Sequence, residues 1–262
     1  MVFSAKSILA TGTFTNVYLC EDNTTILKVI KDTVDNKRLI AEAEIVTQLR
    51  KTRLAGLFPE LLDANAWLQE CEKCPDRFKC FTASKKIDCG LRNNALLYKY
   101  DKDMPSLLEV MNVYPNGIDE RDMIWMYKRM LAAIQTAHNE GVVHSAVLPQ
   151  HVLLNLVNHG ICLIDWMHIN KVGRKPNINK IATNDYYPDY KLTADNSTAL
   201  DIHMASVCAA KLIGGVDKAS KEIRIILRAG MSGATDALLV HEQMDKVAKK
   251  LYGSVFRPFK VK

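Results

Sequence analysis

The spacing of apolar residues changes partway along the chain, and this change most constrains the fold. Residues 7–31 alternate apolar and polar side chains between turn-forming residues, which is typical of short antiparallel strands. Residues 36–51 carry apolar residues at helical spacing, and residues 58–68 and 95–100 are again expected to be strands. From Asp119, which can cap a helix, the spacing is mostly helical. The pattern predicts an α+β fold with a β-rich N-terminal lobe containing one helix and a mainly helical C-terminal lobe.

The second half of the chain also contains a short β-hairpin and a long polar stretch. Two apolar runs, residues 152–156 and 161–164, are separated by a turn and predict the hairpin. Residues 171–195 are mainly polar and predict a long loop, whereas residues 199–213 predict a second apolar helix. We expect two lobes. The first spans residues 1–101 and contains a Cys-rich insertion at 70–92, and the second spans residues 102–262.

Composition excludes several classes of protein. The chain has 262 residues, of which 48% are hydrophobic and 24% charged, so global disorder is excluded. The net charge of +6 is too small to imply a dedicated nucleic-acid-binding protein. The longest charge-free run, residues 141–164, contains three histidines and several amides, which argues against a membrane span. With no signal peptide and an odd number of cysteines, seven, we expect a cytoplasmic protein without a disulfide framework.

Candidate chemistry is concentrated between residues 141 and 167. His144 and His151 lie in the segment 141–155, and Asp165 follows the second run of the hairpin. These segments resemble the catalytic loop and the metal-binding Asp segment of protein kinases. Other landmarks follow the order of that family: Gly12 within residues 8–18, Lys28, Tyr186–Asp189 and Asp201.

The resemblance implies a two-lobed protein-kinase-like fold whose second lobe is shortened at its C-terminal end. It implies that Gly12, Lys28, Glu42 and Asp165 contribute to a nucleotide site, with Glu42 preferred over Glu44 as the partner of Lys28. It also implies that Asp201 accepts hydrogen bonds from the backbone near His144. The loop, of the form His-x-Ala-x-Leu-Pro-x-His, is similar to that of kinase-like proteins of bacteria and bacteriophages whose function is not established.

Four positions of the catalytic loop depart from the pattern of an active kinase. Ala146 stands where the family has the Asp that accepts the proton of the substrate, and an alanine side chain cannot accept a proton. Ser145 and Leu148 replace the loop Arg and the loop Lys, and His151 replaces a magnesium-binding Asn. Imidazole is a poorer magnesium ligand than an oxygen donor. In the nucleotide site, Ile26 replaces a small Ala and would narrow the pocket.

These departures predict a pseudokinase, a kinase-like pseudoenzyme that acts as a binding or regulatory scaffold for a partner protein. The alternative is an atypical ATP-dependent transferase that retains Lys28, Glu42 and Asp165 and uses ATP and magnesium. In that alternative His144 or His151 would replace the missing base.

Four cysteines form a cluster of their own, and a closed site of four thiolates would hold a structural zinc ion. The cluster consists of Cys71, Cys74, Cys80 and Cys89. An iron–sulfur cluster and unligated cysteines are the alternatives. Basic and aromatic residues alternate around these cysteines, which indicates either a surface for nucleic acid or an acidic partner, or simply a solvated charged face.

Overall fold

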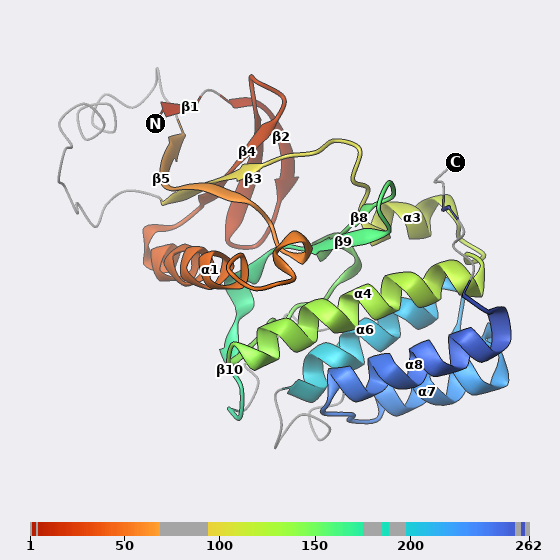
Figure 1. Ribbon diagram of the computed structural model, residues 1–262. Coiled ribbons are helices and arrows are strands. Elements are labelled where there is room, and N and C mark those ends of the chain that lie inside the picture. The colour runs from red at the N-terminus through yellow and green to blue at the C-terminus, as the bar shows by residue number, and fades with distance from the viewer. Residues whose placement is uncertain are drawn as a thin grey trace. The chain divides into compact units, whose positions relative to one another are not determined.

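The computed structural model describes residues 2–3, 5–68, 94–174, 185–188, 198–254 and 258–259. The chain forms two compact units (Figure 1). The first consists of Met1–Thr47 and Glu60–Lys102, and the second of Gln48–Pro59 and Asp103–Lys262. Residues 48–59 therefore group with the second unit although they precede the boundary expected from the sequence. The first unit is rich in strands and the second in helices, so the expected α+β organisation is confirmed.

A six-stranded sheet in the order β1-β5-β6-β4-β3-β2 forms the first unit. Its strands are β1 (Val2–Phe3), β2 (Ala5–Thr11), β3 (Thr15–Cys20), β4 (Thr25–Ile30), β5 (Leu61–Leu68) and β6 (Ala95–Lys99). The pair β1–β5 is parallel and the other pairs are antiparallel. Cys20, Leu27, Ala95 and Leu97 form a buried cluster that joins β3, β4 and β6. The alternating pattern of residues 7–31 thus correctly predicted the meander β2–β3–β4.

Helix α1 (Asn36–Leu49) follows the short 3-10 helix η1 (Thr33–Asp35), whose N-terminus is capped by the Asp32 side chain. Its apolar residues recur at helical spacing, and Leu39, Val46 and Leu49 are completely buried. The expected strand from residue 58 is wrong at its N-terminal end, because β5 begins only at Leu61. Phe58 instead follows the 3-10 helix η2 (Ala55–Leu57). Its ring lies edge-on to Trp166, and both residues belong to the second unit.

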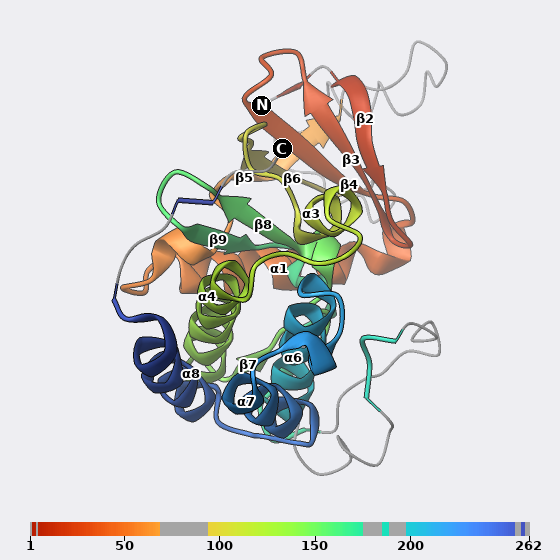
Figure 2. The ribbon, with the colours of Figure 1, turned by 90° about the vertical axis from the view of Figure 1, so that its right-hand side faces the viewer.

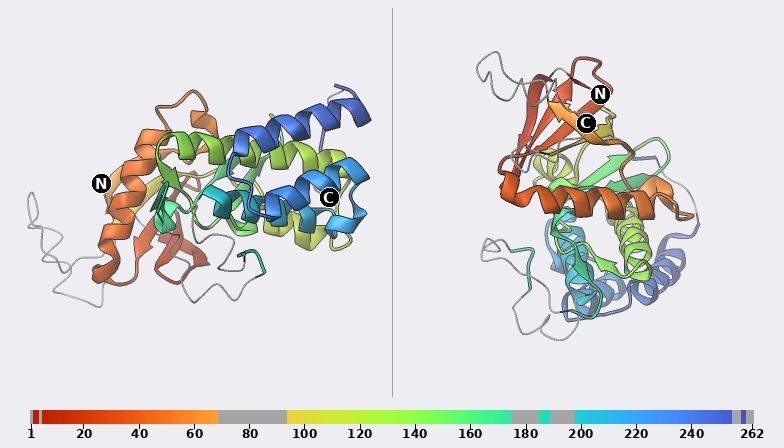
Figure 3. Two further views of the ribbon diagram at one scale, coloured as in Figure 1. Left: turned by 90° about the horizontal axis from the view of Figure 1, so that it is seen from below. Right: turned by 90° about the vertical axis from the view of Figure 1, so that its left-hand side faces the viewer.

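Five described helices form most of the second unit (Figure 2). They are α3 (Leu107–Val113), α4 (Glu120–Asn139), α6 (Thr198–Leu212), α7 (Lys221–Met231) and α8 (Ala237–Tyr252). Helix α4 packs against α6 and α8, and Figure 3 shows the same helices from below. Its N-terminus is capped by the Asp119 side chain, which accepts a hydrogen bond from the Arg121 backbone, as the sequence predicted. The face of α4 that carries Met123, Met126, Met130, Ile134 and Ala137 is fully buried.

Short strands that follow α4 in the sequence hold the segment that carries the candidate site. The predicted hairpin is present as β8 (Val152–Asn155) and β9 (Gly160–Leu163). Strand β7 (Val142–Val143) pairs with β10 (Asn170–Lys171). Residues 144–151 and 164–168 therefore lie between paired strands, which fixes both ends of each segment. No helix in the described part of the chain is both long and apolar enough to cross a bilayer.

Candidate functional site

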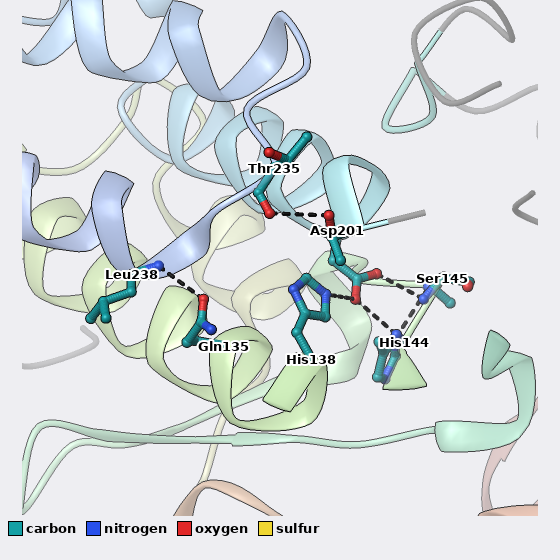
Figure 4. Close-up of polar contacts among 9 residues, drawn as sticks. Gln135, His138, His144, Ser145, Asp201, Thr235 and Leu238 are labelled. Atoms are coloured by element: carbon teal, nitrogen blue, oxygen red, sulfur yellow. Dashed lines mark hydrogen bonds and ion pairs between the residues drawn. The ribbon is translucent and has the colours of Figure 1, made fainter. Parts of the chain in front are cut away.

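The Asp201 carboxylate lies at the centre of a polar network in the second unit (Figure 4). It comes from the first turn of α6 and is completely buried. Its Oδ2 accepts hydrogen bonds from the His144 backbone N–H at 2.8 Å and from His138 Nε2 at 3.0 Å. Its Oδ1 accepts from the Ser145 backbone N–H at 2.8 Å. Asp201 therefore holds the backbone of the 144–151 loop against α4 and α6, and the predicted contact with the backbone near His144 is confirmed.

His144 is fully buried and both of its ring nitrogens have partners. Nε2 lies 2.9 Å from the Ile164 carbonyl oxygen, which can only accept, so Nε2 carries the proton. Nδ1 accepts the Ala146 backbone N–H at 3.2 Å. The ring also meets Trp166 edge-on at a centroid distance of 4.5 Å. Burial lowers the pKa of His144 to about 4, so the ring is neutral at pH 7. This environment supports a structural role for His144 rather than the proton transfer considered from the sequence.

Ala146 occupies the position where the kinase resemblance places the catalytic base. The residue is 1% exposed. Its carbonyl oxygen accepts hydrogen bonds from the Leu148 backbone at 2.8 Å and from His151 Nδ1 at 2.9 Å. Leu148, at the loop-lysine position, is also buried. The loop is thus packed with apolar side chains at two positions where phosphotransfer needs a carboxylate and an ammonium group.

Asp165 faces His151 in the same unit. Its backbone is left-handed, with φ 66° and ψ 60°, which orients it at the start of the 3-10 helix η4 (Trp166–His168). His151 Nε2 lies 3.2 Å from Asp165 Oδ2, and both side chains are mostly buried, at 16% and 21% exposure. The kinase resemblance implies magnesium here, and magnesium prefers oxygen ligands. A nitrogen donor stands at one of the two ligand positions, so the residues present do not fit the pair of magnesium ions that the resemblance implies.

The Lys28–Glu42 ion pair expected from the sequence is present in the first unit. Lys28 Nζ lies 2.7 Å from Glu42 Oε2, and both side chains are buried. Tyr98 on β6 donates its hydroxyl to the other carboxylate oxygen, Oε1, at 2.8 Å. The contact of Tyr98 was not predicted from the sequence. A tyrosine on a buried strand needs a partner for its hydroxyl, and that requirement was the available signal.

Gly12 and Ile26 complete the predicted nucleotide-site residues of the first unit. Gly12 forms the turn between β2 and β3, and its N–H donates to the Thr15 carbonyl at 2.8 Å. A β-carbon at Gly12 would meet only ordinary contacts, so the fold itself does not require glycine there. Ile26 lies on β4 opposite Tyr98 of β6, so a branched side chain and a tyrosine are paired on these strands.

Tyr187 ties the described part of the expected activation segment to the loop, which the sequence did not predict. Its hydroxyl donates to the Ser145 carbonyl at 3.2 Å. Burial, followed by the charges of Asp201 and Asp165, raises the pKa of Tyr187 to about 12. The neighbouring Tyr186 ring lies 4.3 Å from the Lys211 ammonium group. These contacts attach residues 186–188 to α6 and to the loop.

The predicted zinc ligands Cys71, Cys74, Cys80 and Cys89 lie outside the described residues. Within the described ranges, no group of three or more His, Cys, Asp or Glu side chains is arranged to hold a metal ion. Three described cysteines are free thiols: Cys20 on β3, Cys162 on β9 and Cys208 on α6. Burial raises the pKa of each of these thiols above its ordinary value, which makes them poor nucleophiles.

No protein-family model matches the sequence. The chain is 29% identical over 110 residues to citron rho-interacting kinase of Rattus norvegicus, covering 40% of this chain and 5% of that protein. It is 24% identical over 163 residues to serine/threonine-protein kinase ATG1 of Debaryomyces hansenii, covering 58% of this chain and 18% of that protein. The chain thus spans less than a fifth of either curated relative.

The fold is also similar to a solved structure, that of vaccinia related kinase 3. The TM-score is 0.64 at 12% sequence identity, and the match covers 97% of this chain and 89% of the other. At this identity the likeness concerns the fold and not the chemistry. The chain therefore has the two-lobed protein-kinase-like fold.

Proposed function

We propose that this protein is a kinase-like pseudoenzyme that acts as a binding or regulatory scaffold and does not catalyse ordinary Ser/Thr phosphorylation. The observation that carries the proposal is Ala146. Its methyl group occupies the base position, is buried, and lies in a loop whose backbone is held by Asp201. Because the hydrogen bonds of Asp201 fix that backbone, a neighbouring side chain does not move easily to a position where it could act as the base.

The other groups of the loop support the same proposal. Both nitrogens of His144 are hydrogen bonded and buried. His151 is engaged by the Ala146 carbonyl and by Asp165. Loss of a positioned base and loss of a charge stabiliser each reduce the rate by about 10² or more. Together the substitutions at Ala146 and Leu148 predict a rate too low for a physiological kinase.

A scaffold role is supported by what the chain keeps. The Asp201 network and the Lys28–Glu42 pair are the groups that fix a kinase framework, and both are intact within their units. A framework that is held together but lacks a base is suited to binding a partner protein. The sequence of the basic, Cys-rich segment at residues 70–92 makes it a second candidate for contact with nucleic acid or an acidic partner.

An atypical ATP-dependent transferase is the second candidate. The specific observation in its favour is that Lys28 and Glu42 are paired in the buried form that positions nucleotide phosphates in kinases. Asp165 also keeps a strained, left-handed backbone, which is common at functional sites. This candidate predicts turnover of ATP or transfer of a nucleotide-derived group.

One assay distinguishes the two candidates. Purified protein is incubated with γ-labelled ATP and either Mg²⁺ or Mn²⁺, beside the Asp165→Ala variant prepared in the same way. The pseudoenzyme proposal predicts that the two proteins release and transfer phosphate at the same background rate. Turnover by the native chain that disappears in Asp165→Ala would refute it and establish the transferase.

Nucleotide binding is a separate question and needs its own measurement. Thermal unfolding is followed with and without millimolar ATP, for the native chain and for Lys28→Met. A rise in Tm that is lost in Lys28→Met would identify a nucleotide-binding scaffold. An unchanged Tm would restrict the proposal to partner binding and exclude the transferase, once prolonged incubation has excluded slow binding.

We also propose that Cys71, Cys74, Cys80 and Cys89 hold a structural zinc ion. Their number and the Cys-x₂-Cys pair support it. Metal analysis of the purified protein tests the proposal. About one equivalent of zinc, reduced by serine at Cys71 and Cys74, is expected. Less than about half an equivalent of any metal would count against the site.

A further inference from the structure

The contact between His151 and Asp165 departs from the metal chemistry that the fold leads one to expect. The departure concerns the type of donor atom rather than the position of the residues. An oxygen donor at residue 151 would give a hard site for magnesium, whereas His151 offers an imidazole nitrogen. The question is which cation these two side chains favour.

The backbone fixes both side chains. His151 Nδ1 lies 2.9 Å from the Ala146 carbonyl oxygen, which only accepts, so Nδ1 carries a proton and Nε2 is the nitrogen directed at Asp165. The His151 backbone N–H donates to the Leu148 carbonyl, and the His151 carbonyl accepts from the Ile164 backbone, both at 2.9 Å. Ile164, the residue before Asp165, is therefore hydrogen bonded to His151 itself. An imidazole whose far nitrogen donates to a backbone carbonyl has one of the arrangements that are usual for metal-binding histidines.

The separation of the two donor atoms suits a transition-metal ion. Nε2 and Oδ2 lie 3.2 Å apart. If both bound one ion at about 2.1 Å, that separation corresponds to a ligand–metal–ligand angle of roughly 100°, which lies between octahedral and tetrahedral geometry. Both side chains remain partly accessible, so an ion and its water ligands can enter.

We propose that His151 Nε2 and Asp165 Oδ2 bind a first-row transition-metal ion in preference to magnesium, with water or a ligand phosphate at the remaining positions. The mixed nitrogen and oxygen donor pair favours such ions because imidazole binds them well and binds magnesium poorly. The inference goes beyond the proposed function and does not depend on it, because the metal alone can be measured.

Mn²⁺ is the probe for the test. It is the weakest binder of the first-row series and favours oxygen donors, so a nitrogen coupling to bound Mn²⁺ is a stringent result. Its weak binding to thiolates avoids interference from the Cys-rich segment. Metal-free protein is titrated with Mn²⁺, and the loss of the free-ion EPR signal measures binding. Pulsed EPR then detects whether a ¹⁴N nucleus is coupled to the bound ion. We expect one saturable site with a single imidazole coupling, weakened at least tenfold by His151→Ala and by Asp165→Asn.

Two further variants sharpen the test. His151→Asn supplies an oxygen donor, so Mn²⁺ bound to this variant should show no nitrogen coupling. Mg²⁺ should displace Mn²⁺ from the variant at a concentration at least tenfold lower than from the native chain. His203→Asn is the matched control, because His203 Nδ1 likewise lies within hydrogen-bonding distance, 2.7 Å, of a backbone carbonyl, that of Met231. This control should leave Mn²⁺ binding unchanged.

Three results would overturn the proposal. They are the absence of saturable Mn²⁺ binding, bound Mn²⁺ without a nitrogen coupling, and equal displacement by Mg²⁺ from the native chain and from His151→Asn. The first two are read from the native chain alone, so a variant that fails to fold does not affect them.

Discussion

Lys28 Nζ and Glu42 Oε2 lie 2.7 Å apart inside the first unit, with side-chain exposures of only 8% and 2%. A buried charge that loses its partner is strongly destabilising. We expect Lys28→Met to reduce the free energy of unfolding by about 3–5 kcal/mol, because Glu42 would keep a buried carboxylate without its ammonium partner. Urea denaturation measures the change. The Lys28→Met/Glu42→Leu double variant should recover most of the loss, since both charges are then absent.

An exposed pair at the margin of the same sheet, formed by the last residue of β6 and the residue before β5, supplies the control for this prediction. Lys99 and Glu60 lie 3.4 Å apart with side chains 64% and 44% exposed. Surface pairs of this kind contribute little, so Lys99→Met should change the unfolding free energy by less than about 1 kcal/mol. Equal effects of the two substitutions would mean that the Lys28–Glu42 pair is not buried in solution.

Asp201 accepts two hydrogen bonds from the loop backbone and one from His138 on α4, and its removal is the second prediction. Asp201→Ala would leave the backbone N–H groups of His144 and Ser145 buried without an acceptor. Each such group costs about 1–3 kcal/mol, so we expect a loss of about 3 kcal/mol in thermal or urea unfolding. The control is Asp217→Ala, whose side chain is 76% exposed and which should cost less than about 1 kcal/mol.

Much of this framework could be predicted from the sequence, because it depends on local patterns. The meander β2–β4, the face of α4 and the hairpin β8–β9 all follow from the spacing of apolar residues along one segment. Asp201 and the pairing of Lys28 with Glu42 followed from the order of landmarks in a known fold. These contacts are long range, but their positions in sequence are characteristic.

Contacts made by single side chains between distant segments could not be predicted in this way. Phe58 looked like the start of a strand, yet its ring packs against Trp166, over a hundred residues later. The hydroxyls of Tyr98 and Tyr187 bond to Glu42 and to the Ser145 carbonyl. A tyrosine on a buried strand can be expected to have a hydroxyl partner, but the sequence does not say which one, since the partners are set by tertiary packing.

Ser145 gives the third prediction, because its backbone is strained. Its φ is 63°, and among the described residues its buried hydroxyl has no hydrogen-bond partner. A left-handed conformation costs a non-glycine residue about 1–2 kcal/mol, partly offset by the greater entropy of glycine in the unfolded state. We expect Ser145→Gly to stabilise the protein by about 1 kcal/mol in urea denaturation. Ser145→Ala removes the hydroxyl but keeps the strain, so it should be less stable than Ser145→Gly, and the reverse order would contradict the conformation.

Gly230 gives the fourth prediction, because α7 approaches α6 and α4 closely at this residue. A β-carbon there would lie 2.1 Å from Ser206 Oγ and 3.0 Å from the Tyr127 hydroxyl. Ser206 Oγ cannot simply move, because it is bonded to the Tyr127 hydroxyl at 2.7 Å and to the Ile202 carbonyl at 2.7 Å. We expect Gly230→Ala to cost about 3 kcal/mol in thermal unfolding through overpacking and a lost hydrogen bond.

The control for this substitution is Gly56→Ala. A β-carbon at Gly56 would meet nothing within 4 Å, so the change should stay within about 0.5 kcal/mol. If both alanine variants unfold at the same temperature as the native chain, α7 does not pack against α6 as closely at Gly230 as the structure shows.

The fifth prediction concerns pH and rests on His144. Burial lowers its pKa to about 4, an effect that His151 reinforces and that Asp201 and Asp165 oppose. In the unfolded chain the ring has a pKa near 6.5, so below that pH the unfolded state binds a proton that the folded state does not bind. The contribution of His144 to stability is therefore present above about pH 6.5 and is lost as the pH falls toward 4, by up to about 1.4 kcal/mol per pH unit.

Unfolding free energies of the native chain and of His144→Gln, measured between pH 7.5 and 4.5, test this prediction. Burial also lowers the pKa of His203 and His241, so both proteins should lose stability on acidification, but the native chain should lose more. Parallel pH profiles would show that His144 is not held neutral by its surroundings.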